Sequence, residues 1–178
     1  EEILRDQCLS DSKFSATFLR YFNPVGAHKS GLIGELPIGV PNNLVPFITQ
    51  TGIGKRDSLT IFGDDYDTPD GSCIRDYIHV VDLAKAHVKA LAFMERSDAN
   101  CDVFNLGTGK GSSVFEVVKT FEEVSHVKLN YKIGPKREGD ISAVFANASK
   151  ANKELGWETK LTLRDALEDS WNWEKNIK

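Results

Sequence analysis

The 178 residues of this chain are enough for one ordinary domain with an apolar core and too few for two. The 22 basic and 26 acidic residues give a formal net charge of -4, and no basic run is long enough to follow a nucleic-acid backbone, so nucleic acid is not an expected partner. There is no apolar stretch of the roughly 20 residues that cross a bilayer, and the start lacks signal-peptide features, so we expect a cytoplasmic protein with no membrane partner. The three cysteines are scattered and lack metal-ligand spacing, so we expect reduced thiols and no metal.

The first eight residues already show helical periodicity, with Ile3, Leu4 and Cys8 on one side. No N-cap residue stands before them, so we expect the chain to begin inside a helix. Residues 1–178 are therefore expected to be the C-terminal portion of a longer protein. We also expect Ile3 and Leu4 to be exposed in this chain.

A strand is predicted from Phe14 to Phe22, because this segment is rich in aromatic and β-branched residues and stops at Asn23-Pro24. A helix, then a strand, then a glycine-containing loop is the order of a doubly wound α/β sheet. In such sheets ligands lie beyond the carboxyl ends of the strands. Asn23 occupies such an end, although asparagine before proline is equally good turn chemistry.

The segment from Gly26 to Pro41 is rich in glycine, which predicts a long loop. Pro41 to Leu44 then opens a helix that continues to about Gly52. The free N–H groups at such a helix start can bind a phosphate group. Asn43 can equally be an ordinary N-cap residue.

A short strand at Leu59 to Gly63 is followed by an acidic turn whose spacing does not match a calcium loop. The segment from Gly71 to Asp82 comes next and leads into a helix over Val81 to Glu95. Within it, Arg75 can offer a planar fork of donors to a phosphate group. Arg75 can also form an ordinary surface ion pair with Asp76, and both interpretations remain open at this point.

Residues 102–112 look like a dinucleotide-binding turn, with a strand, three glycines (Gly107, Gly109 and Gly111) and a helix opened by the capping box from Ser113 to Glu116. The spacing of the glycines is wrong for that turn, however. No acidic residue ends a strand about 20 residues further on, as a ribose contact requires. We therefore interpret this segment as a structural β-turn-α unit.

A charged loop in the last third of the chain pairs Arg137 with Asp140 around a flexible glycine. It can be a solvated turn or one half of a substrate clamp. The other elements predicted in this part are strands at 128–133 and 143–146 and helices from Ser149 to Gly156 and from Thr162 onward.

Six segments together carry a resemblance to a known family: Arg20 to His28, Pro41 to Leu44, Leu59 to Gly63, Asp70 to Asp82, Asn105 to Gly107, and Arg137 to Asp140. In this order they closely resemble the C-terminal part of the UDP-glucose 4-epimerase family, within the extended short-chain dehydrogenases/reductases. The resemblance covers essentially the whole chain. It implies an α/β fold, the C-terminal part of a Rossmann-type doubly wound sheet with a smaller α/β substrate-binding domain.

The resemblance also implies an activity for the intact protein. It would be an isomerase of galactose and carbohydrate metabolism that interconverts UDP-galactose and UDP-glucose through a transient 4-keto sugar, with tightly bound NAD, as a homodimer. In that family the NAD turn and the catalytic Tyr-x-x-x-Lys pair lie N-terminal to this segment. We therefore expect no catalytic residues in this chain and no activity from it alone.

The family reaction requires UDP to be held tightly and the hexose lightly, because a tightly held sugar cannot turn in the pocket. The resemblance implies that Phe22 lies against the nicotinamide side of NAD and that Asn23 reaches the substrate. The other substrate-binding residues that it implies are Asn43 and Leu44 at the pyrophosphate, Thr60, Ile61 and Phe62 at the uridine, Arg75 at the phosphates, and Arg137 and Asp140 at the phosphate and ribose.

Val144 stands four residues beyond Asp140, where several members of the family carry a large aromatic residue beside the hexose. We hypothesise that the smaller side chain leaves room for an N-acetyl group at C2, so that UDP-N-acetylhexosamines are also accepted. The alternative is that Val144 is an ordinary strand residue that packs inward.

Two other functions stay open from the sequence. One is an NAD-dependent nucleotide-sugar dehydratase or decarboxylase of the same family, which needs an additional acid or base in the N-terminal half. The other is a UDP-binding fragment without activity of its own.

Overall fold

The structure is a computed structural model that describes residues 1–97 and 100–177. Its helices are α1 (Glu2–Ser10), α2 (Leu44–Gly52), α3 (Val80–Arg96), α4 (Val114–Ser125) and α5 (Leu163–Asn176), with a short π-helical turn η1 (Ala151–Leu155). Its strands are β1 (Ala16–Tyr21), β2 (Asn23–Val25), β3 (Leu59–Phe62), β4 (Ile74–Arg75), β5 (Tyr77–His79), β6 (Cys101–Leu106), β7 (Ser112–Ser113), β8 (Tyr131–Gly134) and β9 (Ala143–Val144).

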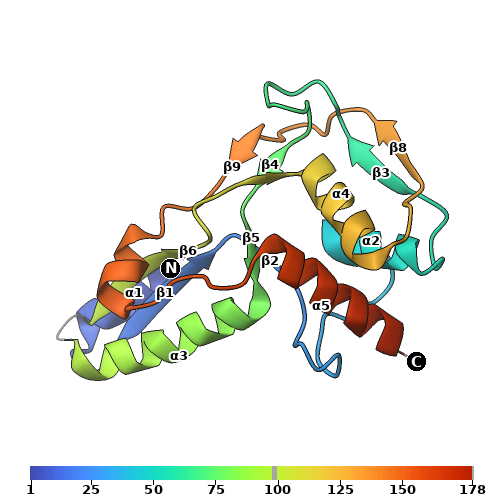
Figure 1. The fold of residues 1–178 in the computed structure, drawn as a ribbon. Helices are drawn as coiled ribbons and strands as arrows, with labels where there is room; N and C mark the ends of the chain where they lie inside the picture. Colours follow the sequence, from blue (N-terminus) through green and yellow to red (C-terminus); the bar gives the residue numbers. More distant parts are fainter. Residues whose placement is uncertain (98–99, 178) are drawn as a thin grey trace.

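The strands form short, mainly parallel sheets. β1 pairs with β6, β2 with β5 and β3 with β8, all in parallel, while β4 lies between antiparallel β7 and parallel β9. In Figure 1, β1, β6, α1 and α3 gather at one end of the molecule and β3, β8, α2 and α4 at the other. This mixture of helices and parallel strands confirms the predicted α/β class.

Two apolar clusters form the core, one for each end of the molecule. The first lies beside a cavity described below, and we call it the cavity-side cluster. It contains Val25, Val45, Ile48, Leu59, Ile61, Tyr77, Val117, Val118, Phe121, Leu129, Ala166, Leu167 and Trp171. The sheet-side cluster contains Ile78, Leu83, Ala86, Phe104, Leu106, Ala151, Leu155 and Trp157. Successive side chains of a strand point to opposite faces, so Tyr77 and Ile78 of β5 enter different clusters and join them.

The structure confirms most predicted elements, with small shifts at their ends. The prediction that pairing stops at Asn23-Pro24 is wrong, because Asn23 to Val25 pairs with Tyr77 to His79. Proline is tolerated here since alternate residues of a strand present their N–H groups to opposite sides. Among the described residues β2 pairs only with β5, so no ladder hydrogen bond is lost at Pro24.

Apolar side chains on α1 remain exposed, as expected from the sequence: Ile3 is 84% exposed and Leu4 43%. In the part of the chain that the structure describes, no helix has the length and apolar character that a membrane span needs. No group of three or more His, Cys, Asp or Glu side chains in that part is placed to hold a metal ion.

Candidate functional site

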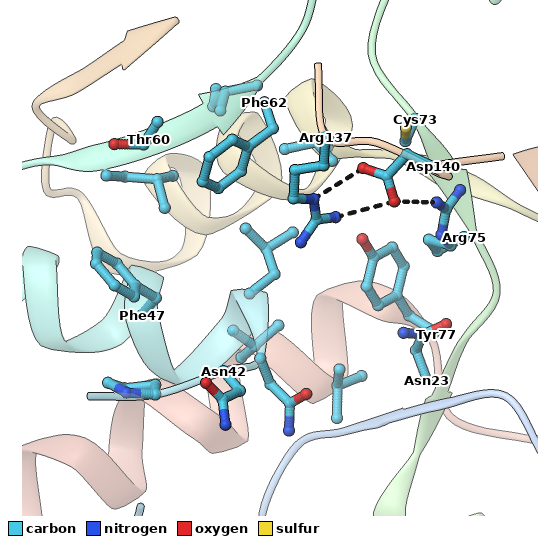
Figure 2. A pocket seen from close by; sticks show the side chains of 18 of the residues that line it. Asn23, Asn42, Phe47, Thr60, Phe62, Cys73, Arg75, Tyr77, Arg137 and Asp140 are labelled. Atoms are coloured by element: carbon cyan, nitrogen blue, oxygen red, sulfur yellow. Dashed lines mark hydrogen bonds and ion pairs between the residues drawn. The ribbon is translucent and has the colours of Figure 1, made fainter. Parts of the chain in front are cut away.

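A cavity of about 570 Å³ opens beside the cavity-side cluster. This volume lies within the roughly 300–1,000 Å³ that is typical of small-molecule sites. Six parts of the chain line it: the end of β1 with β2, the start of α2, β3, the segment from β4 to β5, the first residue of α4, and the loop after β8 (Figure 2). Residues that are far apart in the sequence therefore meet around one space.

The cavity brings together nearly all the residues that the sequence singled out. Its lining includes Phe22, Asn23, Asn43, Leu44, Thr60, Ile61, Phe62, Arg75, Arg137 and Asp140. Val144 does not line the cavity. It lies in β9, directly opposite Arg75 in the pairing with β4.

Arg75, Arg137 and Asp140 form what we call the guanidinium cluster. Arg137 Nε donates to Asp140 Oδ2 at 2.8 Å, and Arg75 Nη2 donates to Asp140 Oδ1 at 3.3 Å (Figure 2). One carboxylate thus lies between two guanidiniums, and the cluster carries a formal charge of one positive unit. An excess of positive charge in a partly enclosed cavity attracts an anion.

The two arginines are held to different degrees. Arg75 Nη1 donates to the main-chain oxygens of Ile74 at 2.9 Å and Ile141 at 2.7 Å, and its side chain is only 19% exposed. Arg137 is 57% exposed, and its guanidinium lies 5.1 Å from the centre of the Phe62 ring. Arg75 is therefore a fixed donor, whereas Arg137 has more freedom to follow a ligand.

The surface ion pair between Arg75 and Asp76 is not present. Asp76 is completely buried, and Arg75 pairs with Asp140 instead. The reason is the alternation of an extended chain, which turns the side chains of neighbouring residues to opposite sides. Arg75 faces the cavity with Tyr77, while Asp76 points into the protein.

The start of α2 lies at the cavity, and Leu44 and Val45 of its first turn carry main-chain N–H groups. Asn43 is the N-cap residue, but its side chain makes no cap hydrogen bond. Its Nδ2 instead donates to Glu35 Oε1 at 3.2 Å. Asn43 is thus the N-cap residue by position, as one of the two interpretations had it, but its side chain does not cap the helix. Asn43, Leu44 and Val45 all line the cavity, and a helix start of this kind favours an anion.

Sequence reasoning missed several lining residues, among them Phe47, Cys73 and Tyr77. A signal was present for two of them, since Cys73, Arg75 and Tyr77 are spaced by two and share one side of an extended segment. Burial raises the pKa of Tyr77 to about 12, although the nearby Arg75 lowers it. The phenol therefore keeps its proton at neutral pH and can donate a hydrogen bond.

The glycine-rich segment after β6 does not offer a phosphate site. Gly109 N donates to Asp76 Oδ2 at 3.0 Å, and a Cβ atom at Gly107 would lie 2.5 Å from that same oxygen. A buried carboxylate thus occupies the space that a pyrophosphate would need. The close approach explains the glycines and supports the structural interpretation of this β-turn-α unit.

Comparison with known proteins gives one family match. A family model described as GDP-mannose 4,6 dehydratase matches residues 3–170. The UDP-glucose 4-epimerase of Haemophilus influenzae is 54% identical over 176 residues, which make up 99% of this chain and 52% of that relative. The chain therefore spans about half the length of the curated relatives it matches.

Solved structures give the same picture. The UDP-glucose 4-epimerase of Stenotrophomonas maltophila, with bound NAD and formylated UDP-arabinopyranose, matches with a TM-score of 0.94 and 46% identity. That of Bifidobacterium longum, in complex with NAD+ and UDP, matches with a TM-score of 0.92 and 50% identity. Each match covers 98% of this chain and 52% of the other. This likeness confirms the predicted Rossmann-type α/β fold class.

Proposed function

The chain belongs to the family described by the GDP-mannose 4,6 dehydratase model, within the extended short-chain dehydrogenases/reductases, and on that basis we propose that the intact protein is a nucleotide-sugar epimerase. It interconverts UDP-galactose and UDP-glucose through a transient 4-keto sugar. Residues 1–178 supply its C-terminal portion, in which the last Rossmann elements are interleaved with the UDP-sugar-binding part. The observation that carries the proposal is the convergence of two guanidiniums and a helix start on one cavity.

The diphosphate is held by charge in this proposal. Arg75 and Arg137 donate to its oxygens, and the N–H groups at the start of α2 face it from another side of the cavity. Asp140 then accepts from ribose hydroxyls, since carboxylate oxygens only accept. When Arg137, the more exposed of the two, turns to the phosphates, its new hydrogen bonds replace those now made to Asp140.

The uridine is placed against β3 in the same proposal. Thr60, Ile61 and Phe62 line the cavity next to the guanidinium cluster, and Phe62 as a whole residue is 41% exposed. An exposed aromatic face can stack on a base. The uridine and the diphosphate thus account for most of the binding energy, and the hexose is left free to turn.

The hexose lies toward Asn23 at the carboxyl end of β1. This side chain is a neutral amide, and Phe22 beside it is partly buried. An amide can orient a hydroxyl without holding it as strongly as a charged group does. Light contact at this point suits a sugar that must present both faces of C4.

NAD is the cofactor that we propose for the intact protein. Phe22 fits its nicotinamide side, because a partly buried aromatic ring stands at the carboxyl end of a parallel strand. The glycine-rich segment near Asp76 does not fit its pyrophosphate, which is therefore held by other parts of the protein. When bound, NAD supplies a reversible hydride acceptor for C4 of the sugar.

We further propose a homodimeric, cytoplasmic protein. The exposed apolar side chains of α1, with Ile3 84% and Leu9 86% exposed, support burial of that helix in an interface. The three cysteines are free thiols, which suits a reducing compartment. Light scattering of the intact protein tests the dimer, and a monomer alone would count against it.

The test of the proposed function is conversion of UDP-galactose by the intact protein. We expect UDP-glucose of unchanged mass as the product, with the C4 hydrogen retained when the reaction runs in heavy water. A product that has lost water or carbon dioxide would instead identify a dehydratase or decarboxylase. Calorimetry of residues 1–178 with UDP then shows whether this part alone binds the nucleotide.

The wider substrate range that we propose depends on Val144. It pairs opposite Arg75, a residue of the cavity lining, which supports a position near the substrate, although Val144 itself does not line the cavity. Comparing turnover of UDP-glucose and UDP-N-acetylglucosamine in the intact protein and in Val144→Tyr tests this. We expect the larger side chain to lower turnover of the N-acetylated sugar more, and an unchanged ratio would refute the idea.

A further inference from the structure

Asp76 is a buried carboxylate, whereas one of the two sequence-based interpretations of Arg75 would have placed it in a surface ion pair. Its Oδ1 accepts from Thr108 N at 2.9 Å and from Thr108 Oγ1 at 2.7 Å. Lys110 O lies at the same 2.7 Å from this hydroxyl, but the charged carboxylate is the stronger acceptor for its one proton. Its Oδ2 accepts from Gly109 N and Ala146 N, both at 3.0 Å. Each oxygen of the carboxylate thus receives two neutral donors, and these donors come from two segments far away in the sequence.

No basic side chain in the described residues pairs with Asp76. A buried charge is costly unless hydrogen bonds replace its water, and here four of them do. The space is filled closely, since a Cβ atom at Gly107 would lie 2.5 Å from Asp76 Oδ2 and 2.6 Å from the Ala146 Cβ. The carboxylate therefore fixes the segments after β6 and β9 in one position.

β9 connects the segment that Asp76 fixes to the guanidinium cluster, because Ala146 lies just after this strand and Asp140 just before it. β9 is held to the segment around β4 at both ends, by Ile74 N donating to Ser142 O at 2.8 Å and by Ala146 N donating to Asp76. Just before β9 lie Ile141, whose main-chain oxygen accepts from Arg75, and Asp140, whose carboxylate does the same. The position of β9 thus determines where the Arg75 guanidinium finds its partners.

Asp76 also reaches the other side of the cavity. Its main-chain oxygen accepts from Asn23 N at 2.9 Å, which fixes the first residue of β2. The residues before and after it, Arg75 and Tyr77, both line the cavity. Asp76 thus contacts both parts of the lining. Its side chain holds the segment that carries Asp140, and its main chain holds Asn23.

We propose that Asp76 is a positioning residue of the nucleotide-sugar site: its carboxylate holds β9 against β4, so that Arg75 meets the diphosphate in a fixed geometry. This inference rests on the proposed function. It adds a role for a residue that does not touch the ligand. Precise placement of binding groups matters because small displacements weaken their interactions strongly.

The substitution Asp76→Asn tests this role with little change in shape. An amide group has only one acceptor oxygen, so in either orientation its NH2 meets two of the four donors. We expect the dissociation constant of UDP, measured by calorimetry on the intact protein, to rise by about tenfold or more. Circular dichroism at the same temperature shows that the variant is folded.

Asp82 offers a matched control. It is also completely buried, its Oδ2 accepts from Lys160 N and Leu161 N at 2.6 and 2.8 Å, and its Oδ1 accepts from Lys85 Nζ at 3.2 Å. Unlike Asp76, it has no sequence neighbour that lines the cavity. Asp82→Asn should lower the melting temperature as Asp76→Asn does, while UDP binds within about twofold of the unsubstituted protein. Only a positioning role predicts that Asp76→Asn binds UDP more weakly than Asp82→Asn does.

The outcomes distinguish this inference from the function on which it rests. If the unsubstituted intact protein does not bind UDP, both fail. If it binds UDP and Asp76→Asn binds equally well, only the positioning role is overturned. Should Asp76→Asn not fold, Thr108→Val removes one donor and keeps the carboxylate; an affinity about threefold weaker supports the role, and an unchanged affinity overturns it.

Discussion

Two parts of the cavity lining, the guanidinium cluster and the carboxyl end of β1, differ in charge. The guanidinium cluster places two arginines on one carboxylate, and main-chain oxygens fix Arg75. The carboxyl end of β1 offers Phe22 and Asn23, which are neutral. Among the described residues, the cavity lining carries its basic side chains only in the guanidinium cluster.

This difference indicates how one site can bind tightly and still let part of its ligand move. Charge-assisted hydrogen bonds are about twice as strong as neutral ones, so we expect the guanidinium cluster to contribute most of the affinity for an anionic ligand. A neutral amide at the end of β1 can orient a group without holding it in one place. In the proposed epimerase this division matches the demand of the reaction, a fixed nucleotide and a sugar free to turn.

Arg75→Ala should have the largest effect of the changes at the cavity. It removes a charged donor that is largely buried and fixed, and such donors are worth about 1.5–3 kcal/mol. We expect UDP affinity of the intact protein to fall by about 100-fold in calorimetry. A loss below about threefold would mean that the diphosphate lies elsewhere.

Arg164→Ala is the control for this change. Arg164 pairs with Glu123 on α4, and both side chains are about half exposed. It therefore removes the same charge from the chain without touching the cavity. UDP affinity should stay within about twofold, because exposed charges at this distance are screened.

Asn23→Ala should separate turnover from affinity. The amide is proposed to orient the hexose, so its loss should lower kcat for UDP-galactose by about tenfold while UDP binds within about twofold. Steady-state kinetics and calorimetry on the same preparation measure both. If UDP affinity falls as far as in Arg75→Ala, the contrast between these two parts of the lining is wrong.

Much of this contrast was predictable from the sequence. Helix and strand patterns placed Asn23 at a strand end and Asn43 at a helix start, where parallel α/β sheets keep their ligands. Arg137 and Asp140 are close enough in the sequence to predict their pairing, which the structure confirms. These features depend on local periodicity and short spacing, and such signals survive without tertiary information.

The interior support of the site was not predicted. The sequence suggested for Asp76 only a possible surface pair with Arg75, whereas strand alternation turns it inward, where Thr108 and Ala146 donate to it. Those donors are about 30 and 70 residues away, so no local pattern announces them. Arg75 and Val144, which pair in the structure, are also far apart in the sequence, and their pairing depends on the register of β9.

Arg137→Ala should weaken UDP binding less than Arg75→Ala does. Arg137 is more than half exposed, and water competes for its donors. We expect an affinity loss of about fivefold that shrinks as salt is raised, measured by calorimetry at two salt concentrations. An affinity loss as large as that of Arg75→Ala would show that the fixed placement of an arginine does not determine how much it contributes to UDP affinity.

Asp165→Asn should have the smallest effect, on stability alone. Asp165 belongs to the capping box of α5, a helix whose Leu167 and Trp171 lie in the cavity-side cluster. The Thr162 hydroxyl and main-chain N–H donate to the carboxylate and hold the pKa of Asp165 below its ordinary value of 3.8. A depressed pKa means that the charged form stabilises the fold above pH 3.8, and that this contribution is lost as pH falls through the lower folded value.

We therefore expect Asp165→Asn to lower the free energy of unfolding by about 0.5–1 kcal/mol at pH 7. The difference from the unsubstituted protein should narrow as the pH falls below 3.8, in urea denaturation at a series of pH values. UDP affinity at pH 7 should not change, because the capping box lies outside the cavity. A weaker affinity would show that the placement of α5 controls ligand binding. The difference between the charged and the neutral lining would then not be enough to explain UDP affinity.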